Sequence, residues 1–340
     1  MALDRRLGQG VLFPGPSAAC DDDVRDVPVT DVGWPPLPYE EWRATRETLH
    51  MYTQVIGKLR LALSPFEPEW ANVPLYLTAR GLTTSPMPIG HRTIDAEFDL
   101  IDHVLVLRTS DGAVERRPLG GTVADFYADV TRSLTRLHVD VTLSVLPSEV
   151  PAPIPFPDDR THATYVAAHA ARFFTVLTQV GIVLKQHRAG FRGRTTPVHF
   201  FWGTFDLAVV RYSGRPAAPH GHGVIERFGS DAEEICAGWW PGDARVPFPA
   251  FYAYAYPKPE GIEHARLEPD GSTWSPDAGE FILPYDTARA LPDPDSAVLA
   301  FLRTTYEVAA SRMEWEANLT EVAPPRSHGA RGIIGPGGAA

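Results

Sequence analysis

The chain has 340 residues, of which 44% are hydrophobic and 21% are charged, so it can bury one large core or two smaller ones. Its formal net charge is -11, and no run of Lys or Arg is long enough to follow a phosphate backbone, so neither nucleic acid nor a membrane surface is an expected partner. Cys20 and Cys236 are too few for a disulfide framework, and no stretch approaches the ~18 uninterrupted apolar residues of a membrane span. We therefore expect a globular cytoplasmic protein with a small-molecule ligand, and the sequence leaves its oligomeric state open.

Residues 1–33 and 323–340 show no sustained hydrophobic period, and we expect both to be flexible. From residue 39 on, apolar residues such as Trp42, Leu49 and Ile56 recur at helical spacing, which predicts a long helix with one buried stripe. Short alternating runs between residues 72 and 119, separated by Gly, Asp and Pro, predict antiparallel strands and hairpins. A helix predicted over about 122–137 completes a first half, residues 34–146.

The same order of elements recurs after a Pro-rich stretch at 147–160, which we interpret as a linker because prolines stiffen a connector. The second half, residues 161–322, has a predicted helix at about 161–187, strands from about 197 on, and a helix at about 295–315. The tripeptide T-Q-V precedes both "VPLYLTARG" and "TPVHFFWG", which favours an internal duplication. We predict an α+β fold of two similar halves, each a helix, an antiparallel sheet and a helix, packed together.

The first candidate site lies in "TTPVHFFWGTFDLAVVRYSGR". If this stretch is one strand, His199 shares a face with Phe201 and Phe205, whereas Asp206 lies on the opposite face. A histidine held among aromatic rings could bind a metal or transfer a proton, and a buried carboxylate needs an Arg, a metal or several donors. The alternative is a core histidine bonded to the backbone, with Asp206 in an ion pair with Arg211 or Arg80.

The second candidate site lies in "VPLYLTARGLTTSP", where Tyr76, Thr78 and Arg80 share one strand face. A hydroxyl and a guanidinium side by side suit a carboxylate or phosphate, because Arg can donate two parallel hydrogen bonds. The alternative is the solvated face of an edge strand.

The third candidate site is "GRPAAPHGHGVIE", in which His220, His222 and Glu226 match the first motif of cupins up to its glutamate. "PEGIEH" matches the core of the second cupin motif and adds His264. Such a set could hold iron, manganese or copper. A surface loop is the alternative, because prolines and glycines surround the histidines and several motif glycines are missing.

Fingerprints of phosphate loops, nucleophile elbows and paired-histidine zinc helices are missing from the sequence, so no nucleotide cofactor is expected. Longer stretches, "TLHMYTQVIGKLRLALSP", "VPLYLTARGLTTSPMPIG", "PVHFFWGTFDLAVVRYSGR", "PAFYAYAYPKPEG" and "GEFILPYD" among them, resemble a bacterial domain-of-unknown-function family, number 5996 (DUF5996), from about Trp34 to Glu316. The resemblance implies no known activity. It implies that the recurrent polar positions of the family are His50, Gln54, Arg80, Thr83, Thr84, His199, Trp202, Asp206 and Arg211. A Ser-His-Glu step of the family is Asp231-Ala232-Glu233 in this chain.

These patterns predict an enzyme acting on a small polar or carboxylate-bearing metabolite. The predicted catalytic residues are His199, Asp206 and Glu233, and His199 with Glu233 could hold a divalent iron, manganese, copper or zinc ion. The predicted substrate-binding residues are His50, Tyr76, Arg80, Thr83, Trp202 and Arg211. We further expect Arg80 and Asp206 to approach each other or a common ligand, and His199 to face a cavity reached by Glu233 or His50. The alternatives are a non-catalytic ligand-binding or interaction protein, and a cupin-like metal-dependent oxygenase or isomerase using His220, His222, Glu226 and His264.

Overall fold

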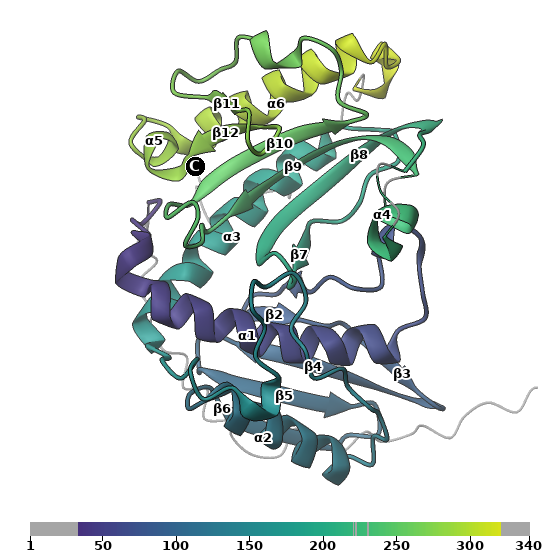
Figure 1. Ribbon diagram of the computed structural model, residues 1–340, viewed down its shortest axis with the longest axis vertical. Helices are drawn as coiled ribbons and strands as arrows, with labels where there is room; N and C mark the ends of the chain where they lie inside the picture. The colour runs from purple at the N-terminus through teal and green to yellow at the C-terminus, as the bar shows by residue number, and fades with distance from the viewer. Residues whose placement is uncertain (1–32, 220, 222, 230, 321–340) are drawn as a thin grey trace, which may run out of the picture. The chain divides into compact units, whose positions relative to one another are not determined.

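A long helix, α1 (Tyr39–Leu63), opens the described part of the chain, as its apolar spacing predicts. The computed structural model describes residues 33–219, 221, 223–229 and 231–320. Residues from Trp34 on form one compact unit, and within the described ranges their strands make two antiparallel sheets (Figure 1). The predicted α+β class is therefore confirmed.

The first sheet follows α1 and has the strand order β1-β2-β4-β5-β6, with β3 paired to β4. Its strands are β1 (Tyr76–Leu77), β2 (Gly81–Thr83), β3 (Met87–Ile89), β4 (Arg92–Asp99), β5 (Val104–Thr109) and β6 (Val114–Pro118). Helix α2 (Val123–Arg136) follows and begins at a capping box formed by Thr122 and Asp125. The Phe126 ring of α2 stacks on Tyr52 of α1 at 4.1 Å, so both helices pack on one core.

The second sheet has the strand order β11-β12-β10-β9-β8-β7. Its strands are β7 (His199–Phe201), β8 (Asp206–Pro216), β9 (Ala232–Trp240), β10 (Ala250–Tyr256), β11 (Thr273–Ser275) and β12 (Glu280–Pro284). The long helices α3 (Ala167–Ala189) and α6 (Pro294–Arg312) lie on one face of this sheet (Figure 1). The short helices are α4 (Val224–Gly229), α5 (Tyr285–Arg289), and the 3-10 turns η1 (Pro68–Trp70), η2 (Phe156–Asp158), η3 (Ile262–His264) and η4 (Ala317–Leu319).

Helix α3 is long and apolar enough to span a membrane by length and composition, with a mean hydropathy of 1.4 over its most apolar window. Half of that window is buried inside the protein, where Phe173 stacks on Trp42 of α1 and on Phe205. Its apolar composition is accounted for by this packing, because a helix covered on several sides by protein carries few polar residues.

One hydrophobic core extends through both sheets, and it includes Phe98 from β4 and Trp239 from β9. Reciprocal backbone hydrogen bonds of 2.9 Å between Leu75 and Phe200 also join the edge of the first sheet to β7. The predicted linker is part of this packing, because Phe156 is fully buried and the backbone of Ser148 is hydrogen bonded to Gln54 of α1. The two halves thus share their interior.

The predicted duplication is not confirmed. Both sheets follow a long helix and precede another, as expected. Their strand orders differ, because β3 lies off the path of the first sheet, whereas β11 extends the second sheet beyond β12.

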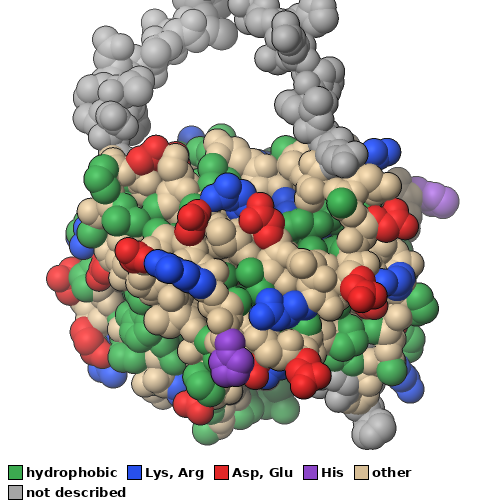
Figure 2. Space-filling view, turned by 90° about the horizontal axis from the view of Figure 1, so that it is seen from above, with side chains coloured by type: hydrophobic (Ala, Val, Ile, Leu, Met, Phe, Trp, Pro, Cys, Tyr) green, Lys and Arg blue, Asp and Glu red, His purple; other side chains and the backbone are tan. Residues whose placement is uncertain are grey.

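The surface seen from above shows acidic and basic side chains interspersed, with apolar side chains between them (Figure 2).

Candidate functional site

The stretch predicted as one strand is a hairpin. Strand β7 ends at Phe201, a turn follows, and β8 begins at Asp206 after Phe205, whose φ is +66°. The turn pairs His199 with Ala208 and Phe201 with Asp206. Since directly paired residues point to the same face of a sheet, His199 and Asp206 share one face, and their predicted placement on opposite faces is wrong.

A cleft of about 1330 Å³ lies over this shared face, which α3 and α6 leave uncovered. Alternate residues of the strands form its floor, among them His199, Phe201, Asp206, Ala208, Val210, Tyr212, Glu234, Cys236, Tyr252, Tyr254, Glu280 and Ile282. Its walls include Arg46 and His50 of α1 and the segment from Asp243 to Phe248. A concavity of this size with several convergent polar groups is typical of a small-molecule site.

Asp206 lies on the floor of the cleft between two hydroxyl groups. Thr204 donates a hydrogen bond to its Oδ1, and Tyr252, two strands away, donates one to its Oδ2. The Tyr252 ring reaches across β9 at Gly238, where a Cβ atom would lie 2.5 Å from the Tyr252 hydroxyl. Burial raises the pKa of Asp206 to about 6, against the opposing effect of these hydrogen bonds, and the charge of Glu149 adds to the rise.

Two further carboxyl groups share the floor with Asp206. Burial raises the pKa of Glu234 and of Glu280 to about 7 in each case. The charge of Asp231 contributes at Glu234, and that of Asp206 contributes at Glu280. Tyr252 and Tyr254 add parallel rings with centroids 6.5 Å apart. The floor is thus acidic and aromatic, and it suits amine or hydroxyl groups better than anions.

Two of the histidines that line the cleft, His199 and His50, are neutral. His199 is 1% exposed, its Nε2 has no hydrogen-bond partner within the described ranges, and burial lowers its pKa to about 4. His50 lies with its Nε2 3.0 Å from the carbonyl oxygen of Trp202 and 2.9 Å from that of Gly203, so this nitrogen carries the proton. Burial, with the charge of Arg46, lowers the pKa of His50 to about 3. His199 and His50 thus both line this one cleft.

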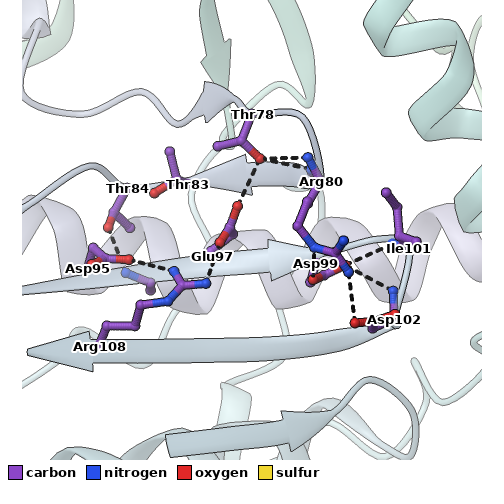
Figure 3. Close-up of polar contacts among 12 residues, drawn as sticks. Thr78, Arg80, Thr83, Thr84, Asp95, Glu97, Asp99, Ile101, Asp102 and Arg108 are labelled. Carbon is purple, nitrogen blue, oxygen red and sulfur yellow. Dashed lines mark hydrogen bonds and ion pairs between the residues drawn. The ribbon is translucent and has the colours of Figure 1, made fainter. Parts of the chain in front are cut away.

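Arg80 and Thr83 lie in the first sheet and do not line the cleft. Arg80 donates hydrogen bonds to Asp99 at 2.5 Å and to Asp102 at 2.7 Å (Figure 3). The hydroxyl oxygen of Thr83 accepts a hydrogen bond from the backbone N–H of Ser85. Because Arg80 and Asp206 have no partner in common, the predicted pocket between them is not formed. The charge of Arg80 is instead neutralised by Asp99, at the end of β4, and by Asp102, in the turn that follows.

Arg211 and Glu233 lie on the face of the second sheet opposite to His199. The Arg211 guanidinium donates to the carbonyl oxygen of His187 and lies over the rings of Phe191 and Tyr306 at 5.0 and 4.6 Å. Glu233 accepts hydrogen bonds from Arg215 (2.8 Å), Ser213 (3.0 Å) and Trp315 (3.1 Å). His199 and Glu233 therefore do not converge as the predicted metal pair.

Tyr76 and Trp202 have packing roles. The Arg60 guanidinium carbon lies 5.4 Å from the centroid of the Tyr76 ring, and that ring contacts His199 edge to face. Trp202 packs against α1 at Gly57, where a Cβ atom would lie 2.1 Å from the indole, and donates to the carbonyl oxygen of Val73 at 2.9 Å. Trp202 also lines the cleft beside His50.

The cupin-like set cannot be assembled from the described residues. His220 and His222, together with the side chain of Glu226, lie outside them, and His264 ends the turn η3. Among the residues that the structure describes, no three His, Cys, Asp or Glu side chains group to hold a metal ion.

Sequence reasoning missed two residues of α1 that line the cleft, Tyr39 and Arg46. They are seven positions apart, which is about two turns, so they lie on one face of the helix, and His50 follows Arg46 by one turn. The available signal was an arginine four residues after Trp42, on the apolar stripe of an otherwise buried helix.

One family model matches the chain over residues 34–322, and its description is "Family of unknown function (DUF5996)". The match covers both sheets and the cleft, so the resemblance seen in the sequence is confirmed. No curated protein and no solved structure matches the chain.

Proposed function

Since the chain belongs to the DUF5996 family, whose description assigns no activity, we propose a function from the cleft itself. The protein is an enzyme that binds a small polar molecule over the open face of the second sheet. Asp206 transfers a proton to or from this molecule. The observation that carries the proposal is a buried carboxyl group in a large cleft, oriented by two hydroxyls and paired with no cation within the described ranges.

The pKa of Asp206 supports this role. A value of about 6 leaves both the acid and the carboxylate accessible near neutral pH, as a general acid–base catalyst requires. Thr204 and Tyr252 orient the carboxyl group, so the proton moves along a defined direction. His199 lies on the same face, its Nε2 has no partner among the residues that the structure describes, and it supplies a neutral group for a hydrogen bond to the substrate.

The substrate carries an amine or hydroxyl group in the part that reaches the floor. Asp206, Glu234 and Glu280 accept hydrogen bonds when ionised, and the tyrosine rings favour a nearby cation through their faces. Proton transfer of this kind requires no metal ion. A cytoplasmic location is part of the proposal, because Cys236 is a buried free thiol.

A non-catalytic ligand-binding protein is the second candidate. The observation that favours it is that both oxygens of Asp206 already accept hydrogen bonds from the protein, an arrangement that also serves a purely structural carboxyl group. The same cleft would then bind its ligand without changing it.

The test is untargeted mass spectrometry of a metabolite extract incubated with the full chain. We expect at least one small molecule to be consumed, and Asp206→Asn to reduce that rate by on the order of 10²-fold or more. Asp102→Asn, in the first sheet and exposed, is the matched control and should keep the rate. Equal rates for Asp206→Asn and wild type would refute the proposal. A molecule that co-purifies and binds wild type and variant without being consumed would favour the second candidate.

A further inference from the structure

Two donors in the wall of the cleft have no acceptor in the described part of the chain. Tyr39 and Arg46 are 3% and 6% exposed, and both line the cleft. The Tyr39 hydroxyl and the Arg46 Nε have no hydrogen-bond partner among the described residues, which also offer Arg46 no ion pair within 4.0 Å. The guanidinium carbon lies 5.3 Å from the centroid of the Phe205 ring, and such a ring contact supplies no hydrogen-bond acceptor to Nε.

An arginine in this position needs an anion. A guanidinium stays protonated when it is buried, so it cannot escape the cost of desolvation by losing its charge. A buried charge without a counter-charge is strongly unfavourable, and proteins place such groups where a ligand or partner completes the pair. Tyr39 and Arg46 lie on one face of α1, so their donors can converge on one acceptor group.

The acidic residues nearest to Arg46 do not supply this anion. Asp243 accepts two hydrogen bonds from the Arg245 guanidinium, at 3.0 and 2.8 Å, and two more from the backbone N–H groups of Arg245 and Val246. Asp243 and Glu47 influence Arg46 only through their fields. That negative field disfavours a phosphate dianion, whereas a carboxylate carries a single charge and matches the planar fork of a guanidinium.

We infer that Tyr39 and Arg46 bind the carboxylate of a small monocarboxylic acid in the cleft, where the carboxylate accepts hydrogen bonds from both side chains. This inference rests on the proposed function in that the anchored molecule is the one whose other end reaches Asp206. The sequence predicted Arg80 and Arg211 as the substrate-binding arginines, and this inference gives that role to Arg46 instead.

The inference is tested with sodium benzoate, a monocarboxylate with an apolar body suited to the aromatic floor. The full chain is titrated by thermal-shift and isothermal calorimetry, with benzamide as the neutral analogue and sodium chloride at matched ionic strength. We expect benzoate to raise the melting temperature saturably and benzamide to have no effect. Phenyl phosphate should bind more weakly than benzoate. No response of the wild type to benzoate would overturn the inference.

Substitutions of Arg46 and Tyr39 test whether these two residues bind the benzoate carboxylate. Arg46→Gln should weaken benzoate binding by on the order of tenfold or more, Tyr39→Phe by less, and Arg80→Gln, the matched control, should leave it unchanged. Arg46→Met, without benzoate, should be at least as thermostable as the wild type, because it removes an uncompensated charge. If Arg46→Gln folds poorly, Arg46→Lys is used in its place, and the test is then whether Arg46→Lys binds benzoate more weakly than the wild type does. Unchanged benzoate affinity in the Arg46 variant overturns the inference. Asp206→Asn should keep benzoate binding, so failure of the proton-transfer role is distinguishable from failure of the anchor.

Discussion

The hydroxyl of Tyr252 on β10 reaches the carboxyl group of Asp206 on β8 by crossing the intervening strand at Gly238. The register pairs Ala208 with Gly238 and Gly238 with Tyr252, so these three residues lie in one row across the sheet. Only a residue without a Cβ leaves room for the ring at the middle position. The geometry of the floor thus depends on the register of three successive strands, β8, β9 and β10.

Tyr252→Phe should raise the pKa of Asp206 above its value of about 6, because the tyrosine hydroxyl stabilises the ionised carboxylate. The variant should lose about 1 to 3 kcal/mol of unfolding free energy at pH 8, where Asp206 is charged, and less at pH 5. Carbon-13 NMR of the Asp side chains reports the pKa, and urea unfolding reports the stability. A carboxyl titration identical to that of the wild type would contradict the hydrogen bond.

Gly238→Ala should destabilise the protein by about 1 to 3 kcal/mol, as expected for a methyl group inserted into a packed site. Its Cβ would lie 2.3 Å from the carbonyl oxygen of Leu207 and 2.5 Å from the Tyr252 hydroxyl, so both the strand and the ring must shift. Urea unfolding measures the loss. Gly33→Ala, where a Cβ would meet nothing within 4 Å, is the control and should be silent. Equal effects of the two substitutions would refute the argument from contact.

Asp206→Asn should become more stable relative to the wild type as the pH rises. The pKa of Asp206 in the folded state, about 6, lies above its ordinary value of 3.8, so the folded state binds the proton more tightly than the unfolded state does. The wild type therefore loses stability as the pH rises from about 3.8 to about 6, and this loss is complete above the folded pKa. Between pH 4.5 and pH 8 the difference between variant and wild type should grow by about 2 kcal/mol.

Asp99→Asn provides a control that should show almost no change over this pH range. Burial acts to raise the pKa of Asp99, but hydrogen bonds from Arg80 and from two backbone N–H groups outweigh it and lower the pKa below 3.8. A carboxylate with a lowered pKa contributes its stability above the ordinary value of 3.8 and loses it only as the pH falls through the lower, folded value, so the difference between this variant and the wild type should stay nearly constant between pH 4.5 and pH 8. If urea unfolding showed the same growth of the difference for both variants between the two pH values, the assignment of Asp206 as a destabilised carboxylate would be wrong.

His199→Phe should be as stable as the wild type or more stable at pH 8, because the substitution keeps a ring and removes a buried nitrogen without a partner. Burial lowers the folded pKa of His199 from 6.5 to about 4, so the wild type loses stability as the pH falls from 6.5 towards 4, and the variant should not share that loss. Thermal unfolding from pH 8 to pH 4.5 measures both effects. A clear destabilisation at pH 8 would mean that His199 has a partner essential to the fold.

Local pattern alone determined much of this protein. The apolar spacing from residue 39 predicts α1, the alternating runs with turn residues predict strands β1 to β6, and the α+β class follows. These predictions succeed because helical and strand periods are properties of neighbouring residues. The grouping of His199, Trp202 and Asp206 at one site was also visible, since all three lie within eight residues of chain.

The tertiary structure alone decided which polar groups meet. Reversal of the chain between Phe201 and Asp206 brought His199 and Asp206 to one face, although alternation along a single strand separates them. Arg80 is paired with Asp99 in the first sheet and so does not reach the site. Packing of α1 places Arg46 in the cleft wall, where the described residues offer it no ion pair within 4.0 Å. A sequence period reports which side of an element is buried. The partner of a buried charge depends on strand register and helix packing between segments far apart in the chain, and these are set only when the whole core forms.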